Sequence, residues 1–182
     1  MKNPYSHFIE GEKIYLREVR ETDVNEDYYR WMNDSEITQY LETRFYPNSQ
    51  PRILNFVKSK FEDPNNVFLA IVSKENDKHI GNVKLGPINW IHRTGEIGIV
   101  LGDKQMWGKG IATETLNLMS AYAFNKLNLR KLTAGCYSNN NGSEKAFVKA
   151  GYIVEGIRQN HFFCDGNYVD YILLGLMNPN YR

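Results

Sequence analysis

The residues in this sequence most able to do chemistry are two glycines one residue apart, Gly108 and Gly110. Glycine lacks a Cβ atom, so it can take a positive φ angle and lets the main chain approach an anion closely. A run with helical spacing begins directly after Gly110, and the free amides at the start of such a helix point back toward the same anion. Core residues recur along this run at Ile111, Thr115, Leu118, Met119, Tyr122, Ala123 and Phe124. The turn and the helix together predict a binding site for a phosphate or diphosphate group.

Other phosphate-binding loops fit these residues less well. The pattern G-x-x-x-x-G-K-[ST] fails because Lys109 is followed by Gly110 and not by a hydroxyl residue that could bind magnesium. The dinucleotide pattern G-x-G-x-x-G fails because Thr113 stands in the place of the third glycine. The other interpretation is a glycine turn between a strand and a helix that binds no ligand.

The residues around the turn, Gln105-Met106-Trp107-Gly108-Lys109-Gly110-Ile111-Ala112, fit the pattern Q/R-x-x-G-x-G/A. The segment 96–114 resembles the acetyl-CoA loop of the GNAT superfamily of N-acetyltransferases. The block 138–152 is similar to the N-x-x-S...EK-x-GF block of the branch that includes ribosomal-protein N-terminal and spermidine/spermine acetyltransferases, and 88–93 resembles a hairpin segment of the same branch. The resemblance implies acetyl-CoA as co-substrate and direct attack by a primary amine in a ternary complex.

The resemblance also implies which residues bind the coenzyme. The main chain of Gln105, Met106, Trp107, Gly108, Lys109, Gly110, Ile111 and Ala112 would bind its diphosphate. The backbone of Ile99, Val100 and Leu101 would pair with pantetheine like another strand, and one of these amides would polarise the thioester carbonyl. Asn140 matches an asparagine that bonds to the coenzyme near pantetheine. An ordinary buried strand and a helix-capping asparagine are the alternatives that these residues leave open.

Glu96 is the candidate general base, because it matches a frequently acidic position of the family on the strand before the loop. An ammonium cannot attack a thioester, and deprotonating a lysine-like amine of pKa about 10.4 at pH 7 requires about 4.6 kcal/mol, against about 1.4 kcal/mol for an α-amine. The alternative for Glu96 is a solvated strand residue, or one paired with Arg93 or Lys84.

The usual proton donor of the family is missing. The tyrosine that protonates the departing thiolate aligns with Phe147, which has no proton to give. Tyr137, Ser143 and Tyr152 are close in sequence and could take its place, and each could equally have a structural role. A second class of function therefore stays open, a weakly catalytic or non-catalytic module that binds acyl-CoA.

The acceptor site is expected to lie among the first two helices, the loop around Arg44-Phe45-Tyr46 and the last hairpin. Arg44 and Tyr46 are the predicted substrate-binding residues, because a fixed cation beside hydroxyl groups suits an oxygen-rich amine such as an amino sugar. A polyamine pocket would require converging carboxylates, for which Glu36, Glu42 and Glu62 are available. A peptide N-terminus is the third acceptor left open.

Composition limits the class of protein. A chain of 182 residues, 42% of them hydrophobic, predicts a single domain over 1–182. The 22 basic and 21 acidic residues are interspersed, so the overall charge indicates neither a nucleic-acid nor a membrane partner. The resemblance implies a small-molecule amine as partner, and a homodimer stays open. Two cysteines and a polar N-terminus predict a reduced, cytoplasmic protein. His92 and His161 have no partner at metal-ligand spacing, so no metal site is expected.

The elements that must position these residues follow from periodicity and turn signals. Strands are predicted at 13–18, 67–73, 80–85, 95–101, 131–137, 152–163 and 168–176. Helices are predicted at 23–32 with Thr22 as cap, at 35–41, at 51–63 with a stripe of Ile53, Leu54, Phe56, Val57 and Phe61, from 111, and at 141–150 with Gly151 as stop. The sequence Asp165-Gly166 predicts the turn of a closing hairpin.

This order predicts a mixed α/β (α+β) fold, with helices on both faces of a mostly antiparallel sheet. The helix after the loop connects 95–101 to 131–137, and such a crossover makes these two strands parallel. The resemblance implies that this parallel pair is splayed, which leaves a notch for the pantetheine arm.

Overall fold

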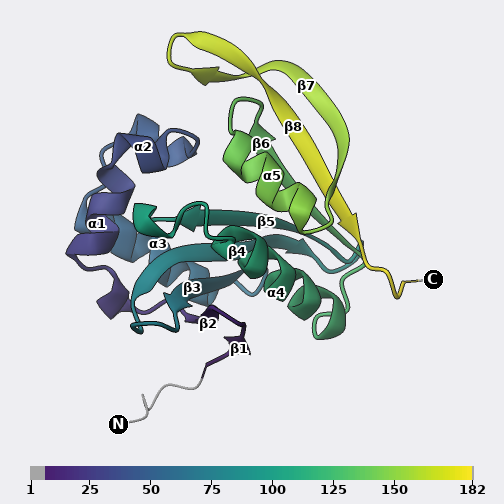
Figure 1. Ribbon diagram of the computed structural model, residues 1–182, viewed down its shortest axis with the longest axis horizontal. Helices are drawn as coiled ribbons and strands as arrows, with labels where there is room; N and C mark the ends of the chain where they lie inside the picture. Colours follow the sequence, from purple (N-terminus) through teal and green to yellow (C-terminus); the bar gives the residue numbers. More distant parts are fainter. Residues whose placement is uncertain (1–6, 182) are drawn as a thin grey trace.

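The protein is represented by a computed structural model, which describes residues 7–181. It contains one eight-stranded sheet with the order β1-β2-β3-β4-β5-β6-β8-β7 (Figure 1). The strands are β1 (Ile9–Glu10), β2 (Ile14–Glu18), β3 (Val67–Ser73), β4 (His79–Asn89), β5 (Thr94–Leu101), β6 (Lys131–Tyr137), β7 (Ile153–Cys164) and β8 (Asn167–Met177). All neighbouring strands are antiparallel except β5 and β6, which confirms the predicted mixed sheet.

Helices cover both faces of the sheet, as the sequence predicts. They are α1 (Glu26–Asn33), α2 (Ser35–Thr38), α3 (Gln50–Glu62), α4 (Ile111–Asn125) and α5 (Asn141–Lys149). On one face, α1 and α3 bury Trp31 and Val57 against apolar residues of β2 and β3. On the other face, α4 and α5 bury Met119 and Phe147 against the centre of the sheet. Two apolar cores therefore hold the sheet between them.

The parallel pair separates after a short contact. Thr94, Gly95 and Glu96 of β5 pair with Lys131, Leu132 and Thr133 of β6, and the pairing ends there although both strands continue. On its other side, β5 stays paired with β4 as far as Leu101, and β6 stays paired with β8 as far as Tyr137. β4 and β8 thus keep the ends of β5 and β6 extended, and a notch opens between the ends of β5 and β6.

Several details differ from the sequence prediction. The strand predicted at 80–85 is β4, which continues to Asn89, and the helix predicted at 35–41 is α2, which ends at Thr38. The first helix begins at Glu26 and not at Asp23, because the side chain of Asn25, and not of Thr22, accepts hydrogen bonds from the amides of the first turn. The two-residue strand β1, which pairs with β2, was not predicted. The stripe of α3 is narrower than its spacing suggests, since Phe56 and Phe61 are 45% and 49% exposed.

The predicted end of α5 and the last hairpin are confirmed. Gly151 follows α5 with a φ of 91°, in the left-handed region that glycine favours. Asp165 and Gly166 have φ angles of 49° and 85°, as a two-residue hairpin turn with the twist of the strands requires. The β7–β8 hairpin is long and curved, and its tip extends toward the segment after α2 (Figure 1). The hairpin tip therefore lies beside residues that are more than 100 positions away in sequence, as the contact from Arg44 to Phe163 shows.

Candidate active site

The glycine turn has the backbone conformation that its spacing predicts. Gly108 and Gly110 have φ angles of 73° and 83°, and Gly110 is the N-terminal cap residue of α4. A Cβ atom at either position would meet no atom within 4 Å, so backbone conformation and not crowding requires glycine here. Within residues 7–181, no side chain caps the start of α4, which leaves the first amides of the helix free to bind an anion.

The residues before the glycines hold the turn in place. The Asp103 carboxylate accepts a hydrogen bond from the Gln105 amide at 3.0 Å, and the Trp107 indole donates to the Leu101 carbonyl oxygen at 3.0 Å. The Met106 side chain is buried in the core beneath α4. The turn is therefore fixed to the end of β5, and its glycines and Lys109 stay exposed.

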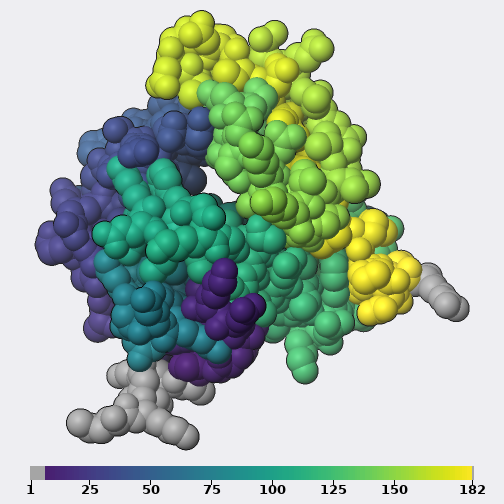
Figure 2. Space-filling view, viewed as in Figure 1, coloured from purple at the N-terminus to yellow at the C-terminus, as the bar shows by residue number. Residues whose placement is uncertain are grey.

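A cavity of about 520 Å³ occupies the notch and passes between the two strands. One wall is β5 from Glu96 to Leu101, and the turn reaches the cavity with Trp107, Gly108 and Ala112. The opposite wall is the end of β6, followed by Asn140, Ser143 and Phe147 at the start of α5. Figure 2 shows an opening between the segment that contains α2 and the segment that contains β6 and α5. A ligand at the turn could thus extend into the cavity.

Carboxylates and aromatic rings line the cavity on the side of α2 and the hairpin. Glu96 is exposed to it, and Glu36 and Glu42 enter from the α2 side. Glu42 accepts a hydrogen bond from the Tyr137 hydroxyl at 2.7 Å, and the Tyr137 ring stacks on Phe162 with centroids 4.1 Å apart. Glu36 is partly neutralised by Lys104, whose Nζ lies 2.6 Å from it. This composition favours a cationic, partly aliphatic ligand.

Tyr171 is a cavity residue that sequence reasoning missed. It faces the same side of the sheet as Tyr137, its partner in the β6–β8 register, and its ring crosses β6 above Gly135. A Cβ atom at Gly135 would collide with the Tyr171 ring and hydroxyl, so only glycine admits this placement. Across the notch, a Cβ atom at Gly98 of β5 would meet no atom within 4 Å, so the cavity is open in front of this residue. The strand register of Tyr171 and Gly135 could have indicated the pair, but the sequence does not give that register.

Burial keeps the cavity tyrosines protonated. Burial raises the pKa of Tyr137, and its hydrogen bond to Glu42 adds to the rise. Burial also raises the pKa of Tyr171, and the nearby charge of Glu96 adds to it. Burial raises the pKa of the Cys136 thiol to about 11, so this cavity residue is a poor nucleophile near neutrality.

The candidate proton donors and Asn140 have distinct environments. Asn140 caps α5 by accepting a hydrogen bond from the Ser143 amide at 3.1 Å, and it also lines the cavity. Phe147 lines the cavity from α5 and is 2% exposed. Tyr152 lies in the core, where its hydroxyl is 3.1 Å from the Ser120 hydroxyl and burial raises its pKa to about 12. Of the three tyrosine and serine candidates, the structure brings Tyr137 and Ser143 to the cavity and leaves Tyr152 outside it.

Arg44 and Tyr46 lie outside the cavity. The Arg44 guanidinium donates to the carbonyl oxygens of Leu41 and Phe163, at 3.0 and 2.7 Å, and to the Tyr137 hydroxyl at 3.0 Å. Tyr46 is 61% exposed and lines a separate surface groove with Arg44. The structure thus places Glu96 with the predicted coenzyme residues of β5, the turn and α5, and does not place the two predicted acceptor residues with them.

Among residues 7–181, no group of three or more His, Cys, Asp and Glu side chains could hold a metal ion. None of the helices in this part of the chain is both long and apolar enough to cross a membrane.

A glycine turn with free amides lies next to a cavity lined by both splayed strands, an arrangement suited to a transferase that works with an acyl-coenzyme A. Residues 13–153 match the protein family described as the acetyltransferase (GNAT) domain, and the chain belongs to this family. The protein is accordingly an N-acetyltransferase with acetyl-CoA as co-substrate.

Several relatives are similar over most of their length. The probable N-acetyltransferase YjcK of Bacillus subtilis (strain 168) is 29% identical over 94% of this chain and 98% of its own. Spermidine N(1)-acetyltransferase of Escherichia coli (strain K12) is 31% identical over 66% of this chain and 73% of its own. In structure, the chain is similar to spermidine N-acetyltransferase from Vibrio cholerae, solved in complex with CoA and spermine. The TM-score is 0.82 and the identity 24%, and the match covers 91% of this chain and 96% of that one. The chain is also similar to ribosomal-protein-S5-alanine acetyltransferase from Vibrio fischeri, with a TM-score of 0.77 and 22% identity over 95% of this chain and 97% of that one. At such identities the structural similarity establishes the fold.

Proposed function

We propose that this protein transfers the acetyl group of acetyl-CoA to a primary amine of a small, linear cation, such as a polyamine. The observation that carries the proposal is the cavity through the notch. It adjoins a turn with free amides, and Glu36, Glu42 and Glu96 all line it.

The coenzyme would enter from the side of the turn. The main chain from Gln105 to Ala112 would bind the diphosphate, with the start of α4 aimed at the negative charge. The free edge of β5 at Ile99, Val100 and Leu101 would pair with the pantetheine arm, since β6 has diverged from it there. Asn140 would contact the same arm while it caps α5. An amide of β5 would then hydrogen-bond to the thioester oxygen as negative charge develops on it.

Glu96 would act as general base from the β5 wall of the cavity. It is exposed to the cavity at the last paired position of β5, where the strands separate. The amine would lose a proton to Glu96, directly or through water, before its lone pair attacks the carbonyl carbon. Because deprotonating a lysine-like amine at pH 7 requires about 4.6 kcal/mol, a nearby carboxylate is useful for such an acceptor.

The acceptor class follows from the residues that line the cavity. Arg44 and Tyr46, on which the expectation of an amino sugar rested, point elsewhere, and the Arg44 guanidinium already has three acceptors. Carboxylates and the rings of Tyr137 and Phe162 suit a second ammonium group and its methylene chain. The spermidine acetyltransferases among the relatives support the same class of acceptor.

A thiol-release assay with a panel of acceptors tests this proposal. The panel contains spermidine, a monoamine of similar length, an amino-sugar nucleotide and a short peptide with a free N-terminus. We expect the highest kcat/KM for spermidine, and a clear loss for the monoamine because it lacks the second charge. A preference for the sugar nucleotide or the peptide would refute the acceptor class. If none of the amines in the panel is acetylated, only binding of acyl-CoA is left as a function. If calorimetry shows no binding of acetyl-CoA at millimolar concentration, the proposed function itself is refuted.

The variant Glu96→Gln tests the base. We expect kcat to fall about a hundredfold or more, and the acidic limb of its pH profile to disappear, with acetyl-CoA binding unchanged. Glu62→Gln is the matched control, because Glu62 ends α3 and lies outside the cavity. An unchanged rate and pH profile in Glu96→Gln would show that Glu96 is not the base.

A further inference from the structure

Three tyrosines line the cavity in the notch, and their hydroxyl groups differ in what they contact. The Tyr40 hydroxyl donates to the Asn139 carbonyl oxygen at 3.1 Å, and the Tyr137 hydroxyl donates to the Glu42 carboxylate at 2.7 Å. Within residues 7–181, no hydrogen bond includes the Tyr171 hydroxyl. This hydroxyl is also absent from the fully buried polar atoms without a partner in that range, so it is open to the cavity. The Tyr171 hydroxyl can therefore donate to a ligand without breaking a bond within the protein.

The Tyr171 hydroxyl lies at the β6 wall of the notch, on the same face of the sheet as Glu96. The ring reaches over β6 so closely that a Cβ atom at Gly135 would collide with the hydroxyl. Glu96 pairs with Thr133 in the parallel register, and Gly135 is two residues further along β6, so both positions face the same side. The charge of Glu96 is near enough to contribute to the raised pKa of Tyr171. The phenol and the candidate base thus face one part of the cavity from its two walls.

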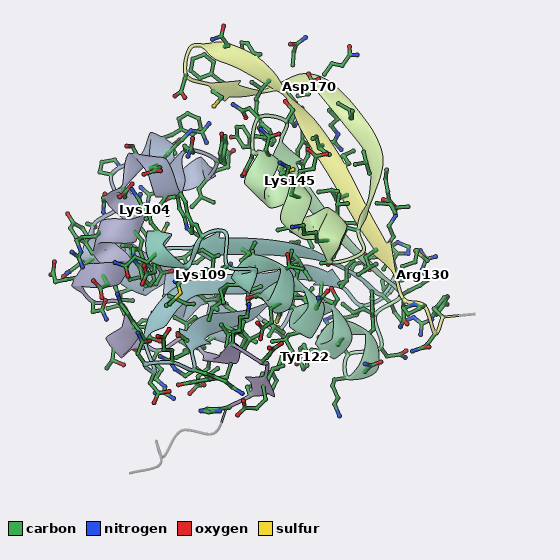
Figure 3. The ribbon with its side chains drawn as sticks, viewed as in Figure 1. Lys104, Lys109, Tyr122, Arg130, Lys145 and Asp170 are labelled. Carbon is green, nitrogen blue, oxygen red and sulfur yellow. The ribbon has the colours of Figure 1, made fainter. Side chains whose placement is uncertain are left out.

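Side chains of β7 hold the Tyr171 ring in this orientation. The His161 ring stacks on it with centroids 5.3 Å apart, and the Phe162 ring meets it edge-on at 4.7 Å. The Arg158 guanidinium lies 5.7 Å from its centroid. Figure 3 shows Asp170, the residue before Tyr171, on the hairpin, and Lys145 on α5. The hydroxyl is therefore preorganised by the hairpin, across the cavity from α5.

The α5 side of the cavity offers a weaker proton donor. Phe147 lines the cavity there and has no proton to give, and Ser143 is an alcohol, which is a weaker acid than a phenol. Burial raises the pKa of Tyr171, the charge of Glu96 adds to the rise, and the Arg158 guanidinium lowers it. Tyr171 is therefore protonated near neutrality.

We propose that Tyr171 is a catalytic residue that gives its proton to the coenzyme sulfur as the thiolate leaves. The inference rests on the proposed acetyl transfer in the notch, with Glu96 as base. Glu96 first releases to water the proton that it took from the amine. When the tetrahedral intermediate collapses, the C–S bond breaks and the sulfur takes the phenol proton. The nitrogen gives its extra proton to Glu96 as the amide forms, and this proton returns to the phenolate, directly or through water. One proton thus moves from nitrogen to sulfur, and both side chains regain their starting states.

Kinetics of Tyr171→Phe test the assignment, with acetyl-CoA and the best amine of the panel in the thiol-release assay. The change keeps the ring and removes the hydroxyl, so we expect kcat to fall about a hundredfold, with the Kd of acetyl-CoA and Tm unchanged. Adding Phe147→Tyr places a phenol on the opposite wall and should raise kcat again by about tenfold or more. In the wild type, Phe147→Tyr should raise kcat less, because a donor is already present. Tyr168→Phe is the matched control, since Tyr168 lies on the same strand, is 64% exposed and is outside the cavity.

The outcomes separate this inference from the proposed function. An unchanged kcat in Tyr171→Phe would overturn the assignment and leave the acetyl transfer intact. A higher KM for the amine at constant kcat would overturn it too, by making Tyr171 an acceptor-binding residue. A fall in kcat that Phe147→Tyr does not reverse would show a structural role, and a larger fall in Ser143→Ala would assign the proton to the serine. Absence of turnover by the wild type with every amine would refute the proposed function instead. A fall in kcat that Phe147→Tyr reverses, with Tyr168→Phe unaffected, is the supporting result.

Discussion

Replacing Arg44 by methionine is expected to destabilise the protein without removing acetyl-CoA binding. Two hydrogen bonds from Arg44, at 3.0 Å to Tyr137 of β6 and at 2.7 Å to Phe163 of β7, connect the segment after α2 to these strands, and a third, at 3.0 Å, goes to the Leu41 carbonyl oxygen within that segment. Its guanidinium also lies 4.1 Å from the centroid of the Phe45 ring. Methionine keeps much of the side-chain volume and removes all three donors.

The magnitude follows from these contacts. A hydrogen bond to a charged group contributes about 1.5–3 kcal/mol when it is well buried. Arg44 is only half-buried, and water can reach the carbonyl groups that it leaves, so we expect a total loss of about 2 kcal/mol in the free energy of unfolding. For a chain of this length, each kcal/mol lowers Tm by about 2–4 °C, which gives a fall of about 4–8 °C.

Urea and thermal denaturation of Arg44→Met measure this loss, and Arg52→Met is the matched control. Arg52 is exposed and makes one long hydrogen bond, at 3.4 Å to the Pro47 carbonyl oxygen, so its loss should change Tm little. The reasoning would be refuted if Arg44→Met were as stable as the wild type and only the KM for the acceptor rose. That result would return Arg44 to the acceptor-binding role that the sequence suggested.

Three further predictions concern the turn, the proton donor and acid stability. Gly110→Ala should lower the free energy of unfolding by about 1–2 kcal/mol, because the φ of 83° at this position strains any residue with a Cβ atom. It should also weaken acetyl-CoA binding in calorimetry, and an unchanged Kd would argue against binding of the diphosphate at this turn. Phe147→Tyr should raise kcat in the thiol-release assay by placing a hydroxyl group in the cavity, and an unchanged kcat would show that another group donates the proton. Burial raises the pKa of Asp23, but hydrogen bonds from Arg17 and the Arg20 amide outweigh burial and hold the pKa below 3.8. The contribution of Asp23 to the free energy of unfolding is therefore complete above pH 3.8 and is lost as the pH falls through the lower pKa of the folded state. Asp23→Asn should make the free energy of unfolding, measured by urea denaturation, depend less on pH in the acid range. An unchanged dependence would exclude Asp23 as its cause.

The parts of the fold that depend on short stretches of sequence were predictable. The positive φ angles of Gly108 and Gly110 and the hairpin turn at Asp165 and Gly166 follow from local steric preferences. The parallel pairing of β5 and β6 follows from the length and helical character of their connection. The cap of α1 was wrong because Thr22 and Asn25 are both good capping residues, and only the path of the chain selects between them.

The composition of the candidate site was predictable only in part. The glycine spacing and the position of Glu96 were sufficient to indicate a turn beside the cavity and one of its carboxylates. The use of Arg44 as a connection to Phe163 could not be inferred, because the two residues are 119 positions apart. A polar residue in a predicted pocket region can bind substrate or hold the pocket together, and sequence alone does not separate these roles.

The sequence by itself determined the backbone of the glycine turn at Gly108 and Gly110, since a two-glycine spacing before a helix limits the conformations open to a few adjacent residues. Tertiary structure decided which side chains meet around that turn. The bond from the Lys13 amide to Glu114 spans 101 positions, and Tyr171 lies above Gly135 only because β8 pairs with β6 in one register. Such contacts depend on how the whole sheet aligns and on how the two cores pack. They are therefore a property of the folded chain and not of any one segment.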